Sequence, residues 1–513
     1  MITAVTLFLL CVMPLFMMAQ PAVPDASNPA KNNRVMVHID HADQFSKKAD
    51  SDVLRLIGHV RITHEDTHFF CDSAYFYEKR NSFEAYENVH ININDSIDMY
   101  CCTMTYDGDR RFAEFFNEVK MMDDSTVLET SYMTYDRNQH LACYPDHAIT
   151  TRGDKQLVSE YGYYQDDMKE FRFFRDVICT SPKYQMFTDT LYYNTRIEKM
   201  WFWGPTQIVN DTNTMEGEHG YYLTERDLVY LDKHPVMYNE TQRLKADSLY
   251  YDRKHGFAKA MNSIDMIDTT YKVILRGEYS EVWEKKGFSF VTDSAQVIYY
   301  DKGDSLFISS DTMFYHFKTD FNDEEKIIGR RNVRFYKSDM QGKCDTMTYT
   351  MADSTLRMRH EPVLWADDAQ MTADSIDIII AHRSIDSVVQ KNNAFIITKD
   401  TIEGYNQIKG EDMISSFRDG NLHHVNVTGS AKTISWLRED DTNLIGINVS
   451  SSNTMQILMD DGTISRIKYY KDIEETLFPE KDLKENDRYL DGFLWLDEFR
   501  PKDRFDIFTS RSL

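Results

Sequence analysis

The stretch Asp247-Ser248-Leu249-Tyr250-Tyr251 is one copy of a unit that recurs along the chain. An acid opens the unit, polar and apolar residues alternate after it, and aromatic residues close it. Asp189-Thr190-Leu191-Tyr192-Tyr193 and Asp72-Ser73-Ala74-Tyr75-Phe76 are further copies. Alternation with a period of two, rich in aromatic residues and followed by polar turns, predicts β-strands with one buried face.

The closing aromatic residue recurs at a constant spacing of 29 residues, at Tyr106, Tyr135, Tyr164, Tyr193, Tyr222 and Tyr251. With some slippage the pattern continues on both sides, at Asp72/Phe76, Glu278/Val282, Asp311/Tyr315, Asp345/Tyr349, Asp374/Ile378 and Glu411. Units this short cannot bury their own apolar faces, so they must stack. About twelve repeats of ~29 residues predict an elongated all-β array, on the order of 115 Å long at two strands per repeat.

The chain divides into four predicted segments. Residues 1–19 are expected to be a cleaved signal peptide, with a predominantly apolar run from Ala4 to Ala19 and an uncleaved anchor helix as the alternative. Residues 20–34 contain three prolines and predict a linker. Residues 35–435 form the repeat array. Residues 436–513 predict a C-terminal strand or cap followed by a charged tail.

The charge balance excludes one class of partner. The 58 basic residues face 83 acidic ones, a formal net charge of −25, which repels nucleic acid. Beyond the predicted signal peptide there are six cysteines without a Cys-x-x-Cys pair, at Cys71, Cys101, Cys102, Cys143, Cys179 and Cys344. Their apolar surroundings favour buried, unpaired thiols, and the even number leaves disulfides open.

One motif raises the question of catalysis. His64-Glu65-Asp66-Thr67-His68 fits the zinc-protease pattern, in which a helix presents two imidazoles on one face. The flanking residues alternate as strands, so we expect a turn here and no metal site. No other catalytic constellation occurs, and neither an enzymatic activity nor a cofactor is expected. The recurrent acids are predicted to cap turns or protect strand edges, with a calcium ladder as the alternative.

Three stretches carry a family resemblance. They are Leu56-Ile57-Gly58-His59-Val60-Arg61-Ile62, Cys71-Asp72-Ser73-Ala74-Tyr75-Phe76-Tyr77 and Phe83-Glu84-Ala85-Tyr86-Glu87-Asn88-Val89. Together they resemble the OstA-like family of lipopolysaccharide-transport periplasmic bridges (LptA-like), in which an L-x-G-N-V unit alternates with an A-D-x-x-x-Y unit. His59 stands where asparagine is usual, whereas Asn88-Val89 and Asn332-Val333 keep the pattern. The resemblance extends over residues 35–435.

The resemblance implies an open jelly-roll of V-shaped antiparallel strands that binds lipopolysaccharide acyl chains inside. The implied function is non-catalytic transfer in the periplasm, between an inner-membrane complex and an outer-membrane barrel translocon. We expect the groove to be lined by an apolar series, Leu56, Val60, Ile62, Val89, Ile91 and Val119. The length of the array suggests that one chain replaces an oligomer of shorter bridge proteins.

Two other functions are compatible with the repeats. An exported structural or adhesive β-solenoid would have a solid core, and a continuous groove of exposed aliphatic side chains would argue against it. A carbohydrate-active β-solenoid enzyme would need a localised acid or metal cluster on one strip of the rod. Periodicity alone does not separate a packed core from a ligand groove.

Overall fold

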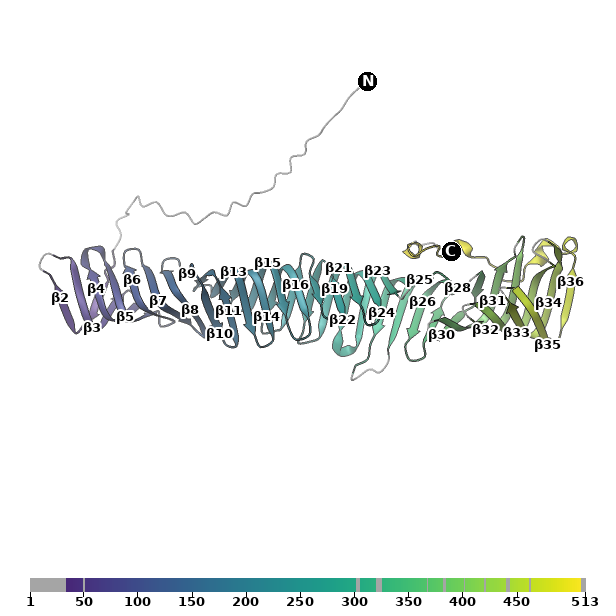
Figure 1. Ribbon diagram of the computed structural model, residues 1–513, viewed down its shortest axis with the longest axis horizontal. Coiled ribbons are helices and arrows are strands. Elements are labelled where there is room, and N and C mark those ends of the chain that lie inside the picture. The colour runs from purple at the N-terminus through teal and green to yellow at the C-terminus, as the bar shows by residue number, and fades with distance from the viewer. Residues whose placement is uncertain are drawn as a thin grey trace, which may run out of the picture.

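The computed structural model shows an elongated rod made of strands (Figure 1). It describes residues 34–508 except for 49–50, 301–304, 320–324, 367, 382–383, 401, 419–420, 440–442 and 461–462. The predicted signal peptide and all of the predicted linker but Arg34 therefore lie outside the described residues. The strands join into one antiparallel sheet, which confirms the predicted elongated all-β fold. The number of repeats stays a prediction.

The strands of the N-terminal half are β1 (His38–His41), β2 (Gln44–Lys47), β3 (Val53–His64), β4 (Thr67–Tyr77), β5 (Ser82–Ile93), β6 (Ile97–Asp107), β7 (Phe112–Asp123), β8 (Thr126–Asp136), β9 (Leu141–Tyr144), β10 (Ala148–Arg152), β11 (Lys155–Ser159), β12 (Tyr161–Gln165), β13 (Glu170–Ser181), β14 (Tyr184–Asn194), β15 (Lys199–Val209), β16 (Thr214–Leu223), β17 (Leu228–Asp232), β18 (Val236–Tyr238), β19 (Gln242–Lys245) and β20 (Ser248–Asp252). A short 3₁₀ helix, η1 (Glu78–Arg80), joins β4 to β5.

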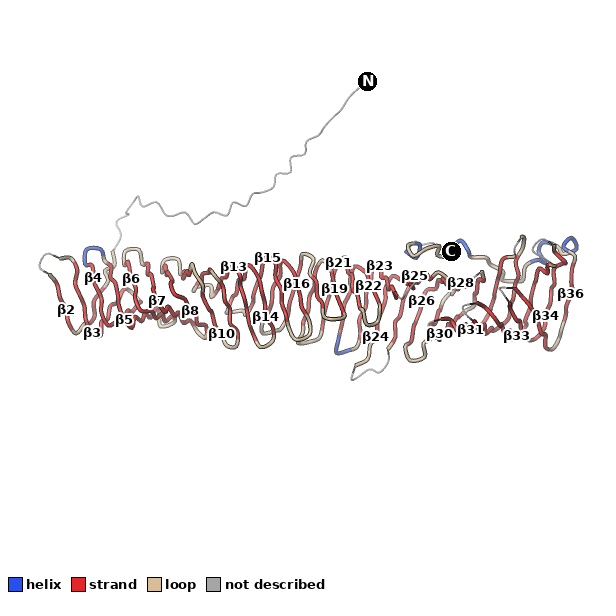
Figure 2. Tube along the Cα trace, viewed as in Figure 1, coloured by secondary structure: helices blue, strands red, loops and turns tan. Residues whose placement is uncertain are grey.

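The strands of the C-terminal half are β21 (Phe257–Asp268), β22 (Val273–Trp283), β23 (Phe288–Tyr300), β24 (Ser305–His316), β25 (Lys326–Lys337), β26 (Met340–Thr350), β27 (Thr355–Arg359), β28 (Val363–Ala366), β29 (Ala369–Thr372), β30 (Ser375–Ala381), β31 (Ser384–Lys399), β32 (Tyr405–Arg418), β33 (Asn421–Arg438), β34 (Leu444–Asp460), β35 (Thr463–Tyr470) and β36 (Glu474–Phe478). The 3₁₀ helices are η2 (Glu284–Lys286), η3 (Glu480–Asp482), η4 (Glu485–Arg488), η5 (Asp497–Phe499) and η6 (Asp506–Phe508). The helices are confined to turns and to the C-terminal segment (Figure 2).

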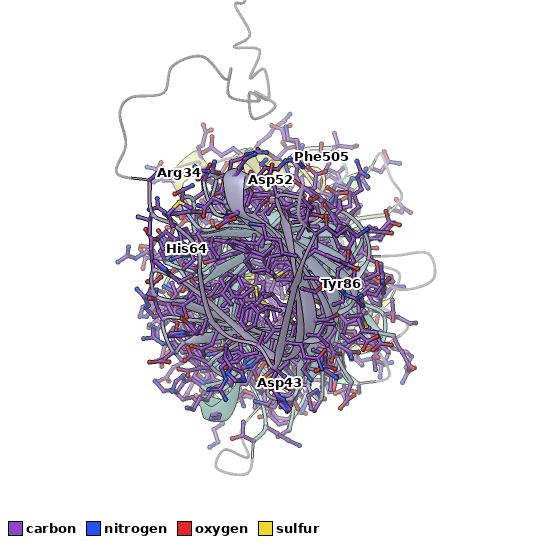
Figure 3. All side chains as sticks on the ribbon, turned by 90° about the vertical axis from the view of Figure 1, so that its left-hand side faces the viewer. Arg34, Asp43, Asp52, His64, Tyr86 and Phe505 are labelled. Atoms are coloured by element: carbon purple, nitrogen blue, oxygen red, sulfur yellow. The ribbon has the colours of Figure 1, made fainter. Side chains whose placement is uncertain are left out.

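Most strands bend at a corner in the middle. In β5 the corner consists of Glu87 and Asn88, both with positive φ, and the pairing with β6 shifts register there. The corner divides a strand into an A arm, such as residues 82–86, and a B arm, such as residues 89–93. Elsewhere the two arms are separate short strands, as in β9 and β10, which both pair with β8. An end-on view places Asp43 at the corner edge, with His64 and Tyr86 on opposite sides (Figure 3).

The recurrent acids contact these corners. Asn88 donates from Nδ2 to an Asp72 carboxylate oxygen at 2.7 Å, and Asn332 donates to Asp311 at 3.1 Å. Glycine is required at Gly58, where φ is +79° and an added Cβ would lie 2.3 Å from Asp43 Oδ2. The acids therefore stabilise left-handed corners on the neighbouring strand, which agrees with the predicted capping role.

The zinc-protease pattern lies at a strand turn, as predicted. β3 ends at His64, β4 begins at Thr67, and Glu65 adopts a positive φ between them. The His64 side chain is fully buried, whereas His68 is exposed on the other face. The two imidazoles therefore do not share a face. The described residues contain no group of three or more His, Cys, Asp or Glu side chains arranged to hold a metal ion.

The six thiols are all unpaired in the structure. Cys71, Cys101, Cys179 and Cys344 are buried, and the other two are half-buried. Burial raises the pKa of the Cys71 and Cys344 thiols to about 12. No helix among the described residues has the length and apolar character needed to cross a membrane.

The C-terminal segment after β36 runs back along the rod (Figure 1). Buried glutamines on the outer face of the sheet bind its backbone. The Gln370 amide accepts from the Leu496 N–H and donates to the Leu494 carbonyl, both at 2.7 Å, and Gln407 makes the same pair of bonds with Leu490 and Arg488 at 2.8 Å. Leu496 and Phe499 of this segment pack on Val363 and Trp365. We call residues 479–508 the strap.

Candidate functional site

The candidate site is the apolar interior between the A and B arms. All six predicted lining residues belong to one buried cluster in the N-terminal half: Leu56, Val60, Ile62, Val89, Ile91 and Val119, each at most 2% exposed. Their alternation along β3, β5 and β7 directs them inward, and Val60, Val89 and Val119 each follow a corner directly. The structure thus brings the predicted residues together. Whether they contact a ligand remains a prediction.

The side of the interior opposite the corners is a seam, where the free ends of the A and B arms face each other. The repeating aromatic residue lies on the A arm beside this seam. We call these positions the seam ladder: Tyr106, Tyr135, Tyr164, Tyr193, Tyr222, Tyr251, Val282, Tyr315, Tyr349 and Ile378. Each ladder position points inward, so its exposure reports whether the seam is closed at that level.

The first five ladder tyrosines are buried, at 0–3% exposure, and each hydroxyl has a polar partner. Tyr193 donates to Glu198 Oε2 at 2.6 Å and Tyr222 donates to Asp227 Oδ1 at 2.7 Å. Burial and these carboxylates raise the pKa of both phenols far above the usual value. The phenols therefore stay protonated. Each hydroxyl donates a hydrogen bond, so no polar atom of the ring is left without a partner at the edge of the core.

Some of these bonds cross the seam from one arm to the other. The Tyr106 hydroxyl lies 2.7 Å from Nδ1 of His64, at the end of a B arm. Tyr164 donates to Asp123, whose carboxylate also accepts from Lys169 Nζ at 2.6 Å. Arg137, after an A arm, donates to Asp66 in the turn between two B arms. These bonds join residues 41 to 71 positions apart and hold the seam shut.

We call a group of hydrogen bonds and ion pairs that crosses the seam a tie. Glu198 is the centre of the tie with the most partners. It accepts from Arg152 at 2.9 Å and from Lys155 at 2.8 Å, both on B arms, and from Tyr193 on the A arm. Although burial opposes ionisation, the hydrogen bonds from Lys155, Tyr193 and Arg152 lower the pKa of Glu198 to about 2. Lys155 also donates to Thr224 Oγ1 at 3.1 Å, so the tie spans two successive A-arm turns.

The seam changes character at Tyr251, the sixth tyrosine of the 29-residue series. Tyr251 is half-buried, and so are the next ladder positions, Val282, Tyr315 and Tyr349. The ladder becomes buried again only at Ile378. We call residues 53–223 the sealed segment and residues 248–350 the open segment. In the open segment, inward-facing Val273, Leu275, Leu306 and Ile308 are likewise half-buried.

Side-chain volume contributes to the difference. In the sealed segment large residues pair across neighbouring arms, as in Phe115 with Met133 and Phe171 with Tyr193. In the open segment some inward pairs contain no large residue, as in Ala260 with Ser280 and Val282 with Ser289. The inward glycines of the sealed segment, Gly162 and Gly220, each face a phenylalanine. Small residues cannot fill the space between two arms, so water reaches the aliphatic positions near the seam.

A cavity of about 60 Å³ lies between the arms where the sealed core ends. Its walls are almost wholly apolar and come from β16–β22, including Leu231, Leu249, Ile264, Leu275 and Val282. It is continuous with the half-buried positions because Leu275 and Val282 belong to both.

Sequence reasoning placed the candidate groove in the N-terminal repeats and missed the open segment. No single position carried the signal, because the inward register of Ser280 already holds glycine in the sealed segment, at Gly162 and Gly220. The cross-seam ties had no local signal, since their partners lie far apart in the chain.

The chain is similar to known proteins over part of its length. A family profile described as OstA-like protein matches residues 32–189. The crystal structure of LptH, the LptA-homologous periplasmic component of the conserved lipopolysaccharide transport device from Pseudomonas aeruginosa, is similar at 17% identity, with a TM-score of 0.14. That similarity covers 27% of this chain and 82% of LptH. No curated protein matches the chain. Over residues 32–189 the chain therefore carries an OstA-like segment, as the resemblance in its sequence predicted.

Proposed function

We propose that this protein is a non-catalytic bridge that carries lipopolysaccharide through the periplasm, with the acyl chains held between the A and B arms. The observation that carries the proposal is an apolar interior that runs along the rod from β3 to β34, through three buried clusters. A long apolar interior flanked by one seam suits an elongated amphiphile, whose acyl chains lie inside while its head group stays in solvent.

The OstA-like segment supports the same function, because its family resemblance implies lipopolysaccharide transport. In the proposed bridge the partners are an inner-membrane complex at one end and an outer-membrane barrel translocon at the other. Export by cleavage of residues 1–19 would deliver the chain to the periplasm. These partners and this location belong to the proposal.

The sealed segment sets a condition on the mechanism. Leu56, Val89 and Val119 touch protein on all sides, so acyl chains reach them only when the arms part and the seam ties break. The ties are hydrogen bonds and ion pairs at the free ends of the arms, whereas the corners continue the sheet. Parting the arms would therefore break side-chain bonds at the seam and leave backbone pairing along the rod intact.

The experiment is photo-crosslinking in cells, with a benzophenone amino acid at Val89 or Val119 and blotting for lipopolysaccharide. We expect a crosslinked product at both positions. The matched control is Tyr100, an aromatic residue on the outer face of β6 that is 40% exposed, where no product is expected. A folded, exported protein that gives no product at Val89, Val119 or any open-segment position would contradict the proposed bridge.

A second function is favoured by the close packing of the sealed segment. An exported structural β-solenoid needs a solid core, and the interior of residues 53–223 is one in this conformation. Under this function the open segment would have no ligand, and crosslinking would fail at every interior position. The same experiment therefore separates the two functions.

A further inference from the structure

We infer that the open segment is a lateral port, in which the acyl chain of an anionic phospholipid-like amphiphile lies between the arms and its phosphate head meets a basic rim. The inference rests on the proposed function. It adds a defined binding site for the ligand and the residues that would select it. The family profile matches residues 32–189, so this site lies outside the profile match, within the wider resemblance over residues 35–435.

The first observation is the run of half-buried aliphatic side chains on the inward face. Val273, Leu275 and Val282 lie on β22, and Leu306 and Ile308 lie on β24, which is separated from β22 by β23. Both arms are represented. In the sealed segment the corresponding residues of β6 and β14, namely Ile97, Met99, Tyr184 and Met186, are at most 5% exposed. A contiguous apolar strip that remains in contact with water is a binding surface for an apolar ligand.

The second observation is the space beneath the strip. The cavity of about 60 Å³ reaches from Ile264, beside a corner, to Val282 at the seam. Ser280 lines the cavity, and Ser289 pairs with the cavity residue Val282. The end of an alkyl chain inserted here would bury the aliphatic walls, and the rest of the chain would lie along the half-buried strip.

The third observation is the charge of the rim. Lys254, Lys285 and Lys286 are exposed in the two A-arm turns that directly follow Tyr251 and Val282. The same turns hold two acids, Asp252 and Glu284, against Arg253 and the three lysines. Glu284 accepts from the Tyr251 hydroxyl at 3.2 Å, and Lys285 Nζ donates to the Lys254 carbonyl at 2.7 Å. In a chain of net charge −25, this local excess of lysine beside an apolar opening complements an anionic head group.

The occupant is therefore a single amphiphile with one or more alkyl chains and a phosphate. A neutral amphiphile would gain the apolar contacts but not the lysines, and an anion without a chain would gain only the lysines. The port would consequently prefer an alkyl phosphate over a neutral detergent of equal chain length, and the preference would weaken as salt screens the rim.

The test uses the purified full chain, with dodecyl phosphate as the probe and isothermal titration calorimetry as the measurement. Ser280→Trp fills the space between the arms and should weaken binding by about tenfold or more. Glu281→Trp places the same side chain on the outer face of the same strand and should leave binding within about twofold. Circular dichroism and thermal unfolding establish that both variants are folded.

The rim is tested by the double substitution Lys285→Glu and Lys286→Glu. We expect weaker binding of dodecyl phosphate, by about fivefold at low salt, and unchanged binding of dodecyl maltoside. Equal losses for both detergents, or equal effects of Ser280→Trp and Glu281→Trp, would overturn the port. If Ser280→Trp fails to fold, the lysine pair alone decides, because its side chains are exposed and outside the core.

The port and the bridge can fail separately. In one outcome, lipopolysaccharide crosslinks at Val89 and Val119 in cells, and Ser280→Trp does not change the affinity for dodecyl phosphate. That outcome would support the bridge and overturn the port. Dodecyl phosphate binding that follows the predictions above, with no lipopolysaccharide crosslink at any interior position, would support the port as an amphiphile site and overturn the bridge.

Discussion

The sealed and open segments share one backbone plan and differ in how their two arms meet. Both have bent strands, left-handed corners and a ladder residue beside the seam. In the sealed segment, Phe115 and Tyr193 fill the interior and Glu198 ties the arms together. In the open segment, Ala260 pairs with Ser280 without a large side chain in the pair, and the Tyr251 and Tyr315 hydroxyls donate along the A-arm edge, to Glu284 and Glu325. A repeat can therefore keep its fold while changing from core to groove.

The largest expected effect comes from placing a charge on matched valines of the two segments. Val119→Asp puts a carboxylate where the native side chain is 1% exposed, and should cost about 3–5 kcal/mol of unfolding free energy. Val282→Asp, at a half-buried position, should cost about 1 kcal/mol or less because water still solvates the charge. Urea unfolding of the two variants measures the difference. Equal costs would mean that the segments are not distinct.

Breaking the central seam tie should have a smaller effect. Glu198→Gln removes the charge that Arg152 and Lys155 share and should cost about 2 kcal/mol locally. Hydrogen exchange should accelerate in the amides near the seam in β10, β11 and β14 and stay unchanged in the open segment. Faster exchange throughout the rod would show that the tie supports the whole fold and not the seam.

The same tie predicts a pH dependence. The pKa of Glu198 is lowered to about 2 in the folded chain, against its usual value of 4.5. A depressed pKa contributes stability that is fully present above pH 4.5 and is lost as the pH falls toward 2. The difference in melting temperature between the native chain and Glu198→Gln should therefore shrink over that interval. A difference that stays constant from pH 5 to pH 2 would contradict the role given to the carboxylate.

The smallest expected effect comes from a substitution that makes the open segment resemble the sealed one. Val282→Tyr restores the aromatic ladder residue at the first aliphatic position of the open segment, and should change stability by less than about 1 kcal/mol. Because the ring would cover the mouth, maleimide labelling of Leu275→Cys should slow several-fold in the Val282→Tyr background. Peptide mass spectrometry distinguishes this thiol from the buried native ones, whose raised pKa keeps them slow.

Several features could be predicted because they are encoded locally. The 29-residue spacing from Tyr106 to Tyr251, the alternation within each unit and the turn at Glu65–Asp66 follow from strand periodicity and turn chemistry over a few residues. The burial of Val60, Val89 and Val119 follows from the same alternation, as does the capping of corners by the recurrent acids. For these features the residues that decide the structure are neighbours in the chain.

Other features depend on residues that are distant in the chain. Lys155 meets Glu198 across 43 positions, and Gln370 meets the strap across 126. Whether an apolar face becomes core or groove depends on the summed volume of side chains from two arms and several strands. Alternation marks a residue such as Val282 as inward-facing, but its exposure is set by what the opposite arm contributes. The sequence by itself therefore determined the strands, the corners and the stacking, while only the tertiary structure decided where the seam closes, because closure is a property of paired surfaces.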